Sequence, residues 1–307
     1  MGGSGGHSSG PSISIEELYA RAHMGTEQRQ YESDVEELMR EHLKDFNDRD
    51  VDAIRKHLAT LQEILSEDAE GTVELLFGGS VSKKTYVNGL SDIDMLVCLN
   101  DTSLENKNPN QVFTHFALML SQKLPGTEVT RGDLAVTVKF GDGHEIQLLP
   151  AKRTATGCRI AEPGKNKWSN VIHPDSFAEK LTRVNQSNGG KVVPAIKLLK
   201  PMNEKLPAAL RLSGYHIESL AIQTFDDYKG RPTFREMIKH FWYKAQSDVL
   251  NQLKDSTGQS RHVDDYLGGG NSDIRKQVSR AIGRIITKIE RSDNSGSTDG
   301  WQELLET

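Results

Sequence analysis

Apolar residues recur every three or four positions over long stretches of the chain, which is the spacing that places them on one face of an α-helix. The stretch 33–65 opens with Ser-Asp-Val-Glu, which has the form of an N-terminal capping box. It predicts either one long amphipathic helix or two helices broken near residues 47–50. A short helix is expected before it, over residues 13–22. Further amphipathic helices are predicted over residues 112–124, 191–200, 212–221, 234–253 and 272–289.

Four shorter stretches have the pattern of β-strands. Residues 73–77 and 95–99 are continuous apolar runs, which are typical of buried strands. Residues 134–140 alternate between apolar and polar side chains, a Gly-Asp-Gly turn follows, and residues 145–149 return as the next strand. The last two stretches are therefore predicted to form a hairpin. Strands interspersed with helices in this way predict an α/β fold.

Composition shifts along the chain predict two lobes. Residues 1–32 begin with a run rich in Gly and Ser and are expected to be disordered or loosely packed. The Asn-Gly-Gly sequence at 188–190 marks a break between a first lobe, residues 33–187, and a helical lobe, residues 188–291. Residues 292–307 open with a segment rich in Ser, Asp and Gly and are expected to form a flexible C-terminus.

Charge, cysteine content and hydropathy exclude several classes of protein. The net charge of −5 argues against a broad, sequence-independent grip on duplex nucleic acid, because such binding depends on many Lys and Arg contacts. The two cysteines, Cys98 and Cys158, predict neither a disulfide framework nor a zinc cluster. No apolar run approaches the ~20 residues that span a bilayer, and no signal peptide is recognised. A cytoplasmic location without a membrane is therefore expected.

The turn that follows the apolar run 73–77 is the first candidate for chemistry. Gly78 and Gly79 allow the backbone to turn sharply and to approach a ligand closely, and Ser80 opens the next segment. Backbone N–H groups at such a turn, with a helix N-terminus behind them, bind phosphate oxygens. Because Gly-Gly-Ser is also an ordinary loop sequence, the turn alone leaves both interpretations open.

Two aspartates lie directly before the apolar run 95–99. Side chains alternate along a strand, so Asp92 and Asp94 point to the same face, about 7 Å apart at the backbone. Two carboxylates on one face cost free energy unless a cation neutralises them, which predicts a divalent-metal site for Mg²⁺ or Mn²⁺. A pair of ions held there could stabilise both oxygens of an in-line phosphoryl displacement. A solvated strand end is the ordinary alternative.

The combined pattern resembles the nucleotidyltransferase superfamily of DNA polymerase beta, whose signature is Gly-Ser, a short helix and then Asp-x-Asp. It is most similar to the cGAS/DncV-like nucleotidyltransferases (CD-NTases), the bacterial oligonucleotide cyclases of CBASS anti-phage systems. The resemblance spans about residues 33–289 and implies a catalytic lobe with a mixed twisted sheet, joined to a C-terminal helical lobe. It also implies that the strand at 145–149 lies beside the aspartates. The residues that carry it are Gly78, Gly79, Ser80, Thr85, Tyr86, Gly89, Ser91, Asp92, Ile93 and Asp94.

The resemblance further implies an enzyme. Asp92 and Asp94 would hold two Mg²⁺ ions, and the turn at Gly79 and Ser80 would bind the phosphates of ATP or another NTP. A ribose hydroxyl would attack the α-phosphorus, pyrophosphate would leave, and ring closure would give a cyclic di- or oligonucleotide. Linear transfer to RNA, a protein or a small molecule would use the same features, and a non-catalytic nucleotide-binding subunit is a further alternative. A regulatory protein partner is implied in preference to long duplex DNA.

A third acidic residue is expected on the strand at 145–149. Relatives place it three positions before the proline that closes this strand, where Gln147 stands before Pro150. Glu145 lies two residues earlier on the same strand face. Either Glu145 is the third catalytic and metal-binding acid, or this position is neutral. His144 is expected to be an ordinary surface residue.

Several residues of the second half are candidates for nucleotide binding by resemblance. Lys197 would meet the triphosphate, and Ser213 and Tyr215 would hold the donor phosphates and base; a solvated lysine and a helix-capping serine are the ordinary alternatives. Trp168 could stack on a base, although packing at the lobe junction is favoured. The last predicted helix has a basic face, expected to be solvated, formed by Arg275, Lys276, Arg280, Arg284, Lys288 and Arg291.

Overall fold

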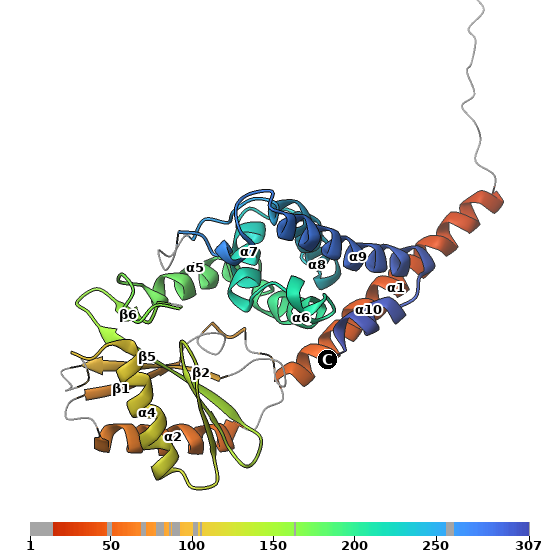
Figure 1. The fold of residues 1–307 in the computed structure, drawn as a ribbon. Coiled ribbons are helices and arrows are strands. Elements are labelled where there is room, and N and C mark those ends of the chain that lie inside the picture. Colours follow the sequence, from red (N-terminus) through yellow and green to blue (C-terminus); the bar gives the residue numbers. More distant parts are fainter. Residues whose placement is uncertain are drawn as a thin grey trace, which may run out of the picture.

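The computed structural model consists of a sheet-containing lobe and a helical lobe that lie side by side (Figure 1). The first, called the sheet lobe below, holds a six-stranded sheet and the helices α2 and α4, and the helical lobe holds the other helices that the structure describes. The structure describes residues 15–47, 51–68, 72–77, 83–85, 87, 93–100, 104, 106–162, 164–255 and 261–306.

The sheet is mixed, as predicted. Its order is β1-β2-β5-β4-β3, and β6 pairs with β5. Strands β2 and β5 run parallel, while all the other pairs are antiparallel. All four predicted strands are confirmed. Strands β3 and β6 were not predicted, because β3 contains a single apolar residue and β6 spans only three residues. The bounds are β1 Thr72–Phe77, β2 Ile93–Asn100, β3 Glu128–Arg131, β4 Val136–Lys139, β5 Glu145–Arg153 and β6 Cys158–Ile160.

One face of the sheet is covered by α2 (Val51–Asp68) and α4 (Pro109–Lys123). Alternate residues of the central strands, such as Val97 and Leu148, pack with Leu61 of α2 and Phe116 of α4 in one buried core. Helix α4 begins at a capping box in which the Asn108 side chain accepts a hydrogen bond from the N–H of Gln111. On the opposite face, Cys98 of β2 and Ala151 of β5 pack with Cys158 and Ile172 in a smaller buried cluster. The remainder of that face is directed toward the helical lobe (Figure 1).

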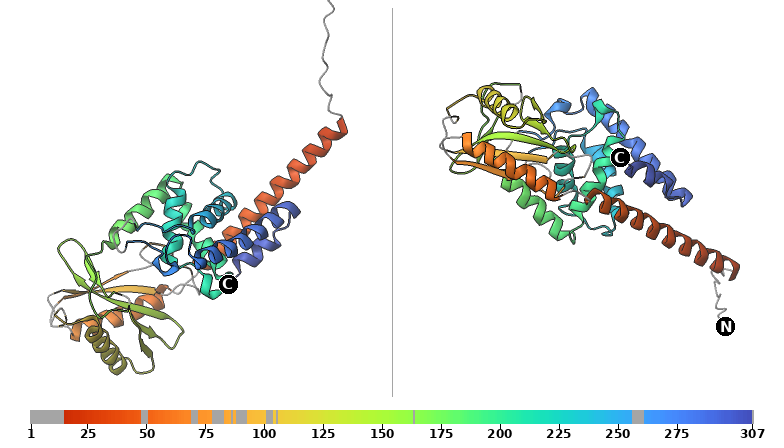
Figure 2. Two further views of the ribbon diagram at one scale, coloured as in Figure 1. Left: turned by 45° about the horizontal axis from the view of Figure 1, so that its top comes forward. Right: turned by 90° about the horizontal axis from the view of Figure 1, so that it is seen from below.

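Helix α1 (Ile15–Asn47) is longer than the sequence predicts. The expected helix over 13–22 and the start of the stretch 33–65 are one continuous helix, and Ser33 lies exposed inside it rather than capping it. The intervening residues are mostly polar, and among residues 24–32 only Tyr31 is buried, so they carry no amphipathic signal. Of the two alternatives for the stretch 33–65, a break near residues 47–50 is confirmed, because α1 ends at Asn47 and α2 begins at Val51. The N-terminal part of α1 projects beyond the helical lobe (Figure 2).

The helical lobe is built from α1 and six later helices around one hydrophobic core. The helices predicted near residues 191, 212, 234 and 272 are confirmed. Helix α5 was not predicted, and its Phe177 and Leu181 are already buried in this core, so the helical lobe includes residues on both sides of the expected break. The bounds are α5 Pro174–Ser187, α6 Val192–Glu204, α7 Gly214–Phe225, α8 Phe234–Asp248, α9 Asp273–Ser295 and α10 Asp299–Leu305.

The C-terminus is ordered, in contrast to the flexible segment expected over 292–307. Gly296, with φ of +67°, ends α9 in the left-handed conformation, which lets the chain reverse into α10. Trp301, Leu304 and Leu305 of α10 are buried in the core of the helical lobe. Three apolar residues therefore anchor a segment whose composition is otherwise polar.

Arg275 does not belong to the expected basic face of α9. Its side chain is fully buried, and its guanidinium lies 2.7 Å from Asp264 Oδ2. The same group donates hydrogen bonds to several carbonyl oxygens, including those of Val249 and Asn251. Arg275 thus ties the start of α9 to the preceding loop. None of the helices that the structure describes is both long and apolar enough to cross a bilayer.

Candidate functional site

Asp94 lies near the start of β2, on the sheet face that α2 and α4 leave uncovered. In the parallel register Asp94 pairs with Gln147 of β5, and the next pair, Met95 with Leu148, is buried in the core beneath those two helices. Because side chains alternate along a strand, Asp94 and Gln147 point away from that core. Both are half-buried. The Asp94 carboxylate therefore lies on the sheet face nearer the helical lobe.

Glu145 is the first residue of β5 and lies on the same strand face as Gln147. It is half-buried and pairs with Lys139 of the neighbouring strand β4. The structure thus brings Asp94 and both candidates for the third position to one end of two adjacent parallel strands. The other residues of the predicted metal and phosphate site, Asp92, Gly79 and Ser80, lie outside the described residues.

A buried ionic cluster lies where the two lobes meet; we call Lys83, Thr85, Lys200 and Glu218 the inter-lobe cluster. Lys200 of α6 donates a hydrogen bond to the carbonyl oxygen of Thr85 at 2.7 Å and lies 3.4 Å from Glu218 Oε1. The Thr85 hydroxyl donates to the same carboxylate, 2.5 Å away, and Lys83 forms an ion pair with it. These hydrogen bonds and ion pairs connect the segment at residues 83–85 to α6 and α7.

The charges of this cluster reach the candidate catalytic strand. Burial lowers the pKa of Lys200 below its ordinary value, with Lys83 adding to the decrease, while the carboxylates of Glu218 and Asp94 oppose it. Burial alone would raise the pKa of Glu218, but Lys83 and Lys200 outweigh this effect and hold the pKa below its usual range. Asp94 therefore lies within electrostatic reach of α6, on the side where the helical lobe approaches the sheet.

Tyr215 and Ser213 lie at the start of α7. The Tyr215 ring is 5.5 Å from Lys83 Nζ and 5.0 Å from the Phe177 ring, and its hydroxyl donates to Asp255 at 3.1 Å. This places Tyr215 beside the segment that follows the Gly-Gly-Ser turn in sequence. Ser213 has the predicted capping role, because its hydroxyl oxygen accepts a hydrogen bond from the N–H of His216.

Lys197 and Trp168 make intramolecular contacts. Lys197 donates a hydrogen bond to the side-chain oxygen of Asn47 at the end of α1. Trp168 packs against the core of the sheet lobe, donates from its indole N–H to the carbonyl oxygen of Lys107 at 3.0 Å, and lies under the ammonium of Lys152. The packing interpretation of Trp168 is therefore confirmed, although it packs within the sheet lobe.

Comparison with known proteins shows the fold. No model of a known protein family matches the sequence, and no curated protein matches it at a significant level. Among solved structures, CdnC of E. coli MS115-1 in complex with HORMA-deltaN has a TM-score of 0.64 and 15% identity, over 83% of this chain and 90% of that one. The CD-NTase CdnG of Bradyrhizobium diazoefficiens in complex with GTP has a TM-score of 0.64 and 13% identity, over 82% and 89%. DncV of Vibrio cholerae, a cyclic AMP-GMP synthase and prokaryotic cGAS homolog, has a TM-score of 0.58 and 12% identity, over 96% and 93%.

The chain has the CD-NTase fold. At these identities the likeness establishes the architecture, so the α/β fold inferred by resemblance, with a nucleotidyltransferase-like sheet lobe and a helical lobe, is confirmed. In this CD-NTase fold, α6 and α7 of the helical lobe lie on the side of the sheet that carries Asp94.

Sequence reasoning missed the role of Glu218. The Glu218 carboxylate is on the buried side of α7, beside Ile217 and Leu220, and only 1% of the residue is exposed. A carboxylate buried in that position requires a cationic partner. Lys200, which sits in an equally apolar run of α6, is such a partner, and the two signals together could have predicted the inter-lobe cluster.

A second hydrogen-bond network, which the sequence did not reveal, connects Ser213 and His216 at the start of α7. Tyr266 accepts a hydrogen bond from the backbone N–H of Ser213 at 3.1 Å, and its hydroxyl lies 2.9 Å from His216 Nδ1. We assign the hydroxyl proton of Tyr266 to the bond with Nδ1, which leaves His216 Nε2 protonated and directed toward Asp264, 3.7 Å away. The start of α7 is held by this network.

The stability of the protein is expected to fall as the pH is lowered from 6.5 to 4, in part because of His216. Burial lowers the pKa of His216 from 6.5 to about 4, with Asp264 opposing and Arg275 adding to the decrease. Between these values the unfolded chain binds a proton that the folded chain does not, so acidification favours unfolding. His216→Gln should remove this contribution. Urea unfolding at several pH values measures it, and a difference between the two proteins that does not change with pH would contradict it.

Proposed function

We propose that the protein is a metal-dependent nucleotidyltransferase that joins NTPs into a cyclic di- or oligonucleotide and releases pyrophosphate. The observation that carries this proposal is the position of Asp94, the last residue of the Ser91-Asp92-Ile93-Asp94 motif. It lies near the start of a central strand, on the face toward the helical lobe, in a CD-NTase fold. The comparison with V. cholerae DncV, a cyclic AMP-GMP synthase, supports the cyclic product.

The donor set at this strand end fits Mg²⁺ or Mn²⁺. Hard divalent cations prefer carboxylate oxygens, and Asp94, which is directed away from the apolar core, presents such oxygens near Glu145. Asp92 and Asp94 would hold the metal, with Glu145 as a third ligand. When bound there, the metal would neutralise phosphate charge and lower the pKa of a ribose hydroxyl.

The remaining steps are assigned to side chains and backbone groups of this chain. The N–H groups of the turn at Gly79 and Ser80 would bind the donor phosphates, and Lys197 would add a positive charge beside them. Tyr215 and Ser213 would position the donor nucleotide at the start of α7. Glu145 would accept the proton of the attacking hydroxyl as the oxygen bonds to the α-phosphorus. The bond to pyrophosphate breaks as the new phosphodiester forms.

Glu145 and Gln147 are expected to differ sharply in importance. A carboxylate at the attacking hydroxyl can neutralise a bound cation and accept a proton, whereas the amide of Gln147 carries no charge and is too weak a base to accept the proton. Glu145→Gln should therefore lower turnover about 100-fold or more with donor NTP binding largely kept, while Gln147→Ala should have a smaller effect. Steady-state rates and NTP titration of both variants measure this. Full activity of Glu145→Gln, with higher activity of Gln147→Asp, would instead make position 147 the acid site.

ATP and other NTPs are the proposed substrates, and a regulatory protein is the proposed partner. Solved structures of the same fold include CdnC with ATP, CdnG with GTP and CdnC with a HORMA protein. The net charge of −5 does not favour activation by long duplex DNA. A role in bacterial anti-phage signalling in the cytoplasm completes the proposal.

Mass spectrometry of the products formed from all four NTPs with Mg²⁺ or Mn²⁺ tests the proposed function. A cyclic product has no terminal phosphate, so it should resist phosphatase, and the Asp94→Asn variant should form none. A phosphatase-sensitive product would identify a linear transferase. Nucleotide binding without pyrophosphate release, with and without candidate partner proteins, would identify a non-catalytic subunit.

A further inference from the structure

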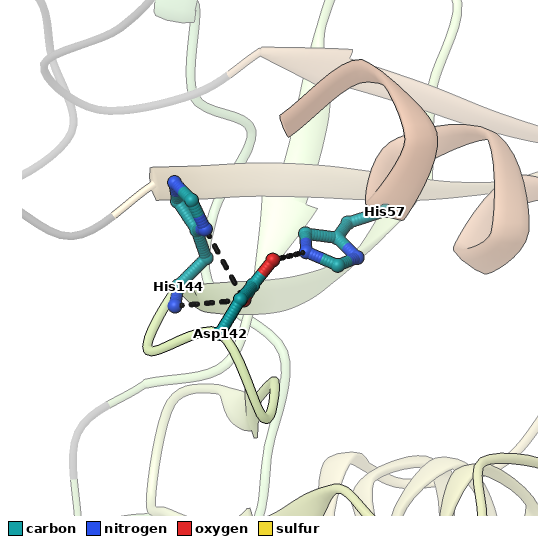
Figure 3. A group of neighbouring side chains, drawn as sticks. All are labelled: His57, Asp142 and His144. Atoms are coloured by element: carbon teal, nitrogen blue, oxygen red, sulfur yellow. Dashed lines mark hydrogen bonds and ion pairs between the residues drawn. The ribbon is translucent and has the colours of Figure 1, made fainter. Parts of the chain in front are cut away.

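A second cluster of ligand-type side chains consists of His57, Asp142 and His144 (Figure 3). His57 comes from α2, and Asp142 and His144 come from the turn between β4 and β5. One ligand atom from each of the three lies within 4.8 Å of the other two. His57 Nε2 is 2.6 Å from Asp142 Oδ2, and His144 Nδ1 is 3.2 Å from Asp142 Oδ1. Two imidazoles therefore converge on one carboxylate from elements far apart in sequence.

The Nδ1 atom of His144 lies beside the Asp142 carboxylate without making a well-formed hydrogen bond. His144 Nδ1 is buried from solvent and, although it lies close to Asp142, the geometry is not that of a hydrogen bond. Buried polar atoms are nearly always hydrogen-bonded, so a nitrogen that lies 3.2 Å from a carboxylate oxygen without hydrogen-bond geometry is incompletely satisfied. A cation bound among the three groups would satisfy it.

The three side chains are held in place before any ligand binds. The His57 ring is stacked on the Phe140 ring with a centroid distance of 3.7 Å, and α2 packs on the core of the sheet lobe. The backbone N–H of His144 donates to Asp142 Oδ1 at 3.2 Å, and Gly143 between them adopts a φ of +91°.

We propose that His57, Asp142 and His144 form a binding site for one Zn²⁺ ion. Two imidazole nitrogens and one carboxylate oxygen, with water as the fourth ligand, are a common donor set for tetrahedral zinc. Bonds of about 2.0 to 2.1 Å place tetrahedral ligand atoms roughly 3.4 Å apart, which small side-chain movements would achieve here. Zinc would replace the proton between His57 Nε2 and Asp142, and that proton would pass to solvent. Mg²⁺, which prefers an all-oxygen shell, does not suit these nitrogens.

This site is separate from the proposed catalytic metal site. Because side chains alternate along a strand, His144 is on the same side as Ile146 and Leu148, which are buried beneath α2 and α4. Glu145 and Gln147 are on the opposite side. A bound zinc ion would join α2 to the turn that leads directly into β5. It would therefore stabilise the position where Glu145 begins the strand, and this inference stands whether or not the protein transfers nucleotides.

Zinc binding by the purified full-length protein tests the proposal. After removal of metals with EDTA, the protein is dialysed against Zn²⁺ and its metal content is measured, and Co²⁺ is used separately because tetrahedral Co²⁺ absorbs visible light. We expect one equivalent of zinc, a rise in melting temperature, and no competition from millimolar Mg²⁺. His57→Gln and His144→Gln should weaken zinc binding about 100-fold or more.

Two matched variants control for other binding. His262→Gln removes an imidazole that also lies beside a carboxylate, 3.0 Å from Asp265 Oδ1. Within the part of the chain that the structure describes, His262 belongs to no cluster of three ligand-type residues, so this variant should bind zinc as the wild type does. Asp94→Asn should also keep its zinc. Circular dichroism in EDTA shows whether each variant is folded. If a histidine variant is unfolded, Asp142→Asn is used in its place. Equal zinc affinity of the wild type and the folded cluster variants would overturn the proposal and leave a hydrogen-bonded contact between α2 and the turn.

Discussion

Replacing Asp94 by Asn is expected to lower nucleotide transfer about 1000-fold or more and to leave the free energy of unfolding nearly unchanged. The carboxylate is assigned to the metal that neutralises the reacting phosphates, and such charge stabilisation is worth several kcal/mol in the transition state. Stability should change little because two effects oppose each other. The variant relieves repulsion from Asp92, but it also removes a negative charge that favours the ammonium of Lys200.

Initial rates with labelled NTPs and urea unfolding without metal measure the two quantities separately. Asp133→Asn is a suitable control, because this exposed aspartate lies in the turn between β3 and β4 of the same lobe. The Asp133→Asn variant should have the same transfer rate and the same free energy of unfolding as the wild type. Retained turnover in both Asp92→Asn and Asp94→Asn would end the proposal that these carboxylates hold the catalytic metal.

The strands that carry the candidate chemistry could be predicted because their signals are local. The apolar run after Asp94 and the alternation from residue 145 onward each identify a strand, and resemblance placed the two side by side. Strand β3 could not be predicted in this way, since it lies at the sheet edge and three of its four residues are exposed. Helix α10 was missed because its few apolar residues follow a segment of loop-like composition.

The contacts between distant residues could not be predicted from sequence. Lys200 and Thr85 are 115 positions apart, and Thr85 and Glu218 are 133 positions apart. His57 and Asp142 are separated by 85 positions, and the count of cysteines, which argued against a zinc cluster, says nothing of sites built from histidine and aspartate. Only the packing of α2 on the sheet and of α6 and α7 against residues 83–85 brings these groups together.

Glu218→Leu is expected to lower the free energy of unfolding by about 3 to 5 kcal/mol, the range found when one partner of a buried ion pair is removed. The leucine would leave Lys83 and Lys200 without the carboxylate that neutralises them, and the Thr85 hydroxyl would lose its acceptor. Adding Lys200→Met should recover part of this loss, because the second buried charge is then removed as well.

Urea unfolding at pH 7 compares these variants with Glu67→Gln, which breaks the exposed pair formed with Lys123 at 3.1 Å and should cost less than about 1 kcal/mol. Both variants delete a carboxylate that faces a lysine, but only Glu218 is buried. The difference between their effects on the free energy of unfolding therefore reports the contribution of burial. The cluster also holds the segment that follows Gly79 and Ser80, so NTP affinity should weaken in Glu218→Leu even where the protein is fully folded. If Glu218→Leu were as stable as Glu67→Gln and bound NTPs normally, the inter-lobe cluster would neither stabilise the fold nor position the phosphate turn.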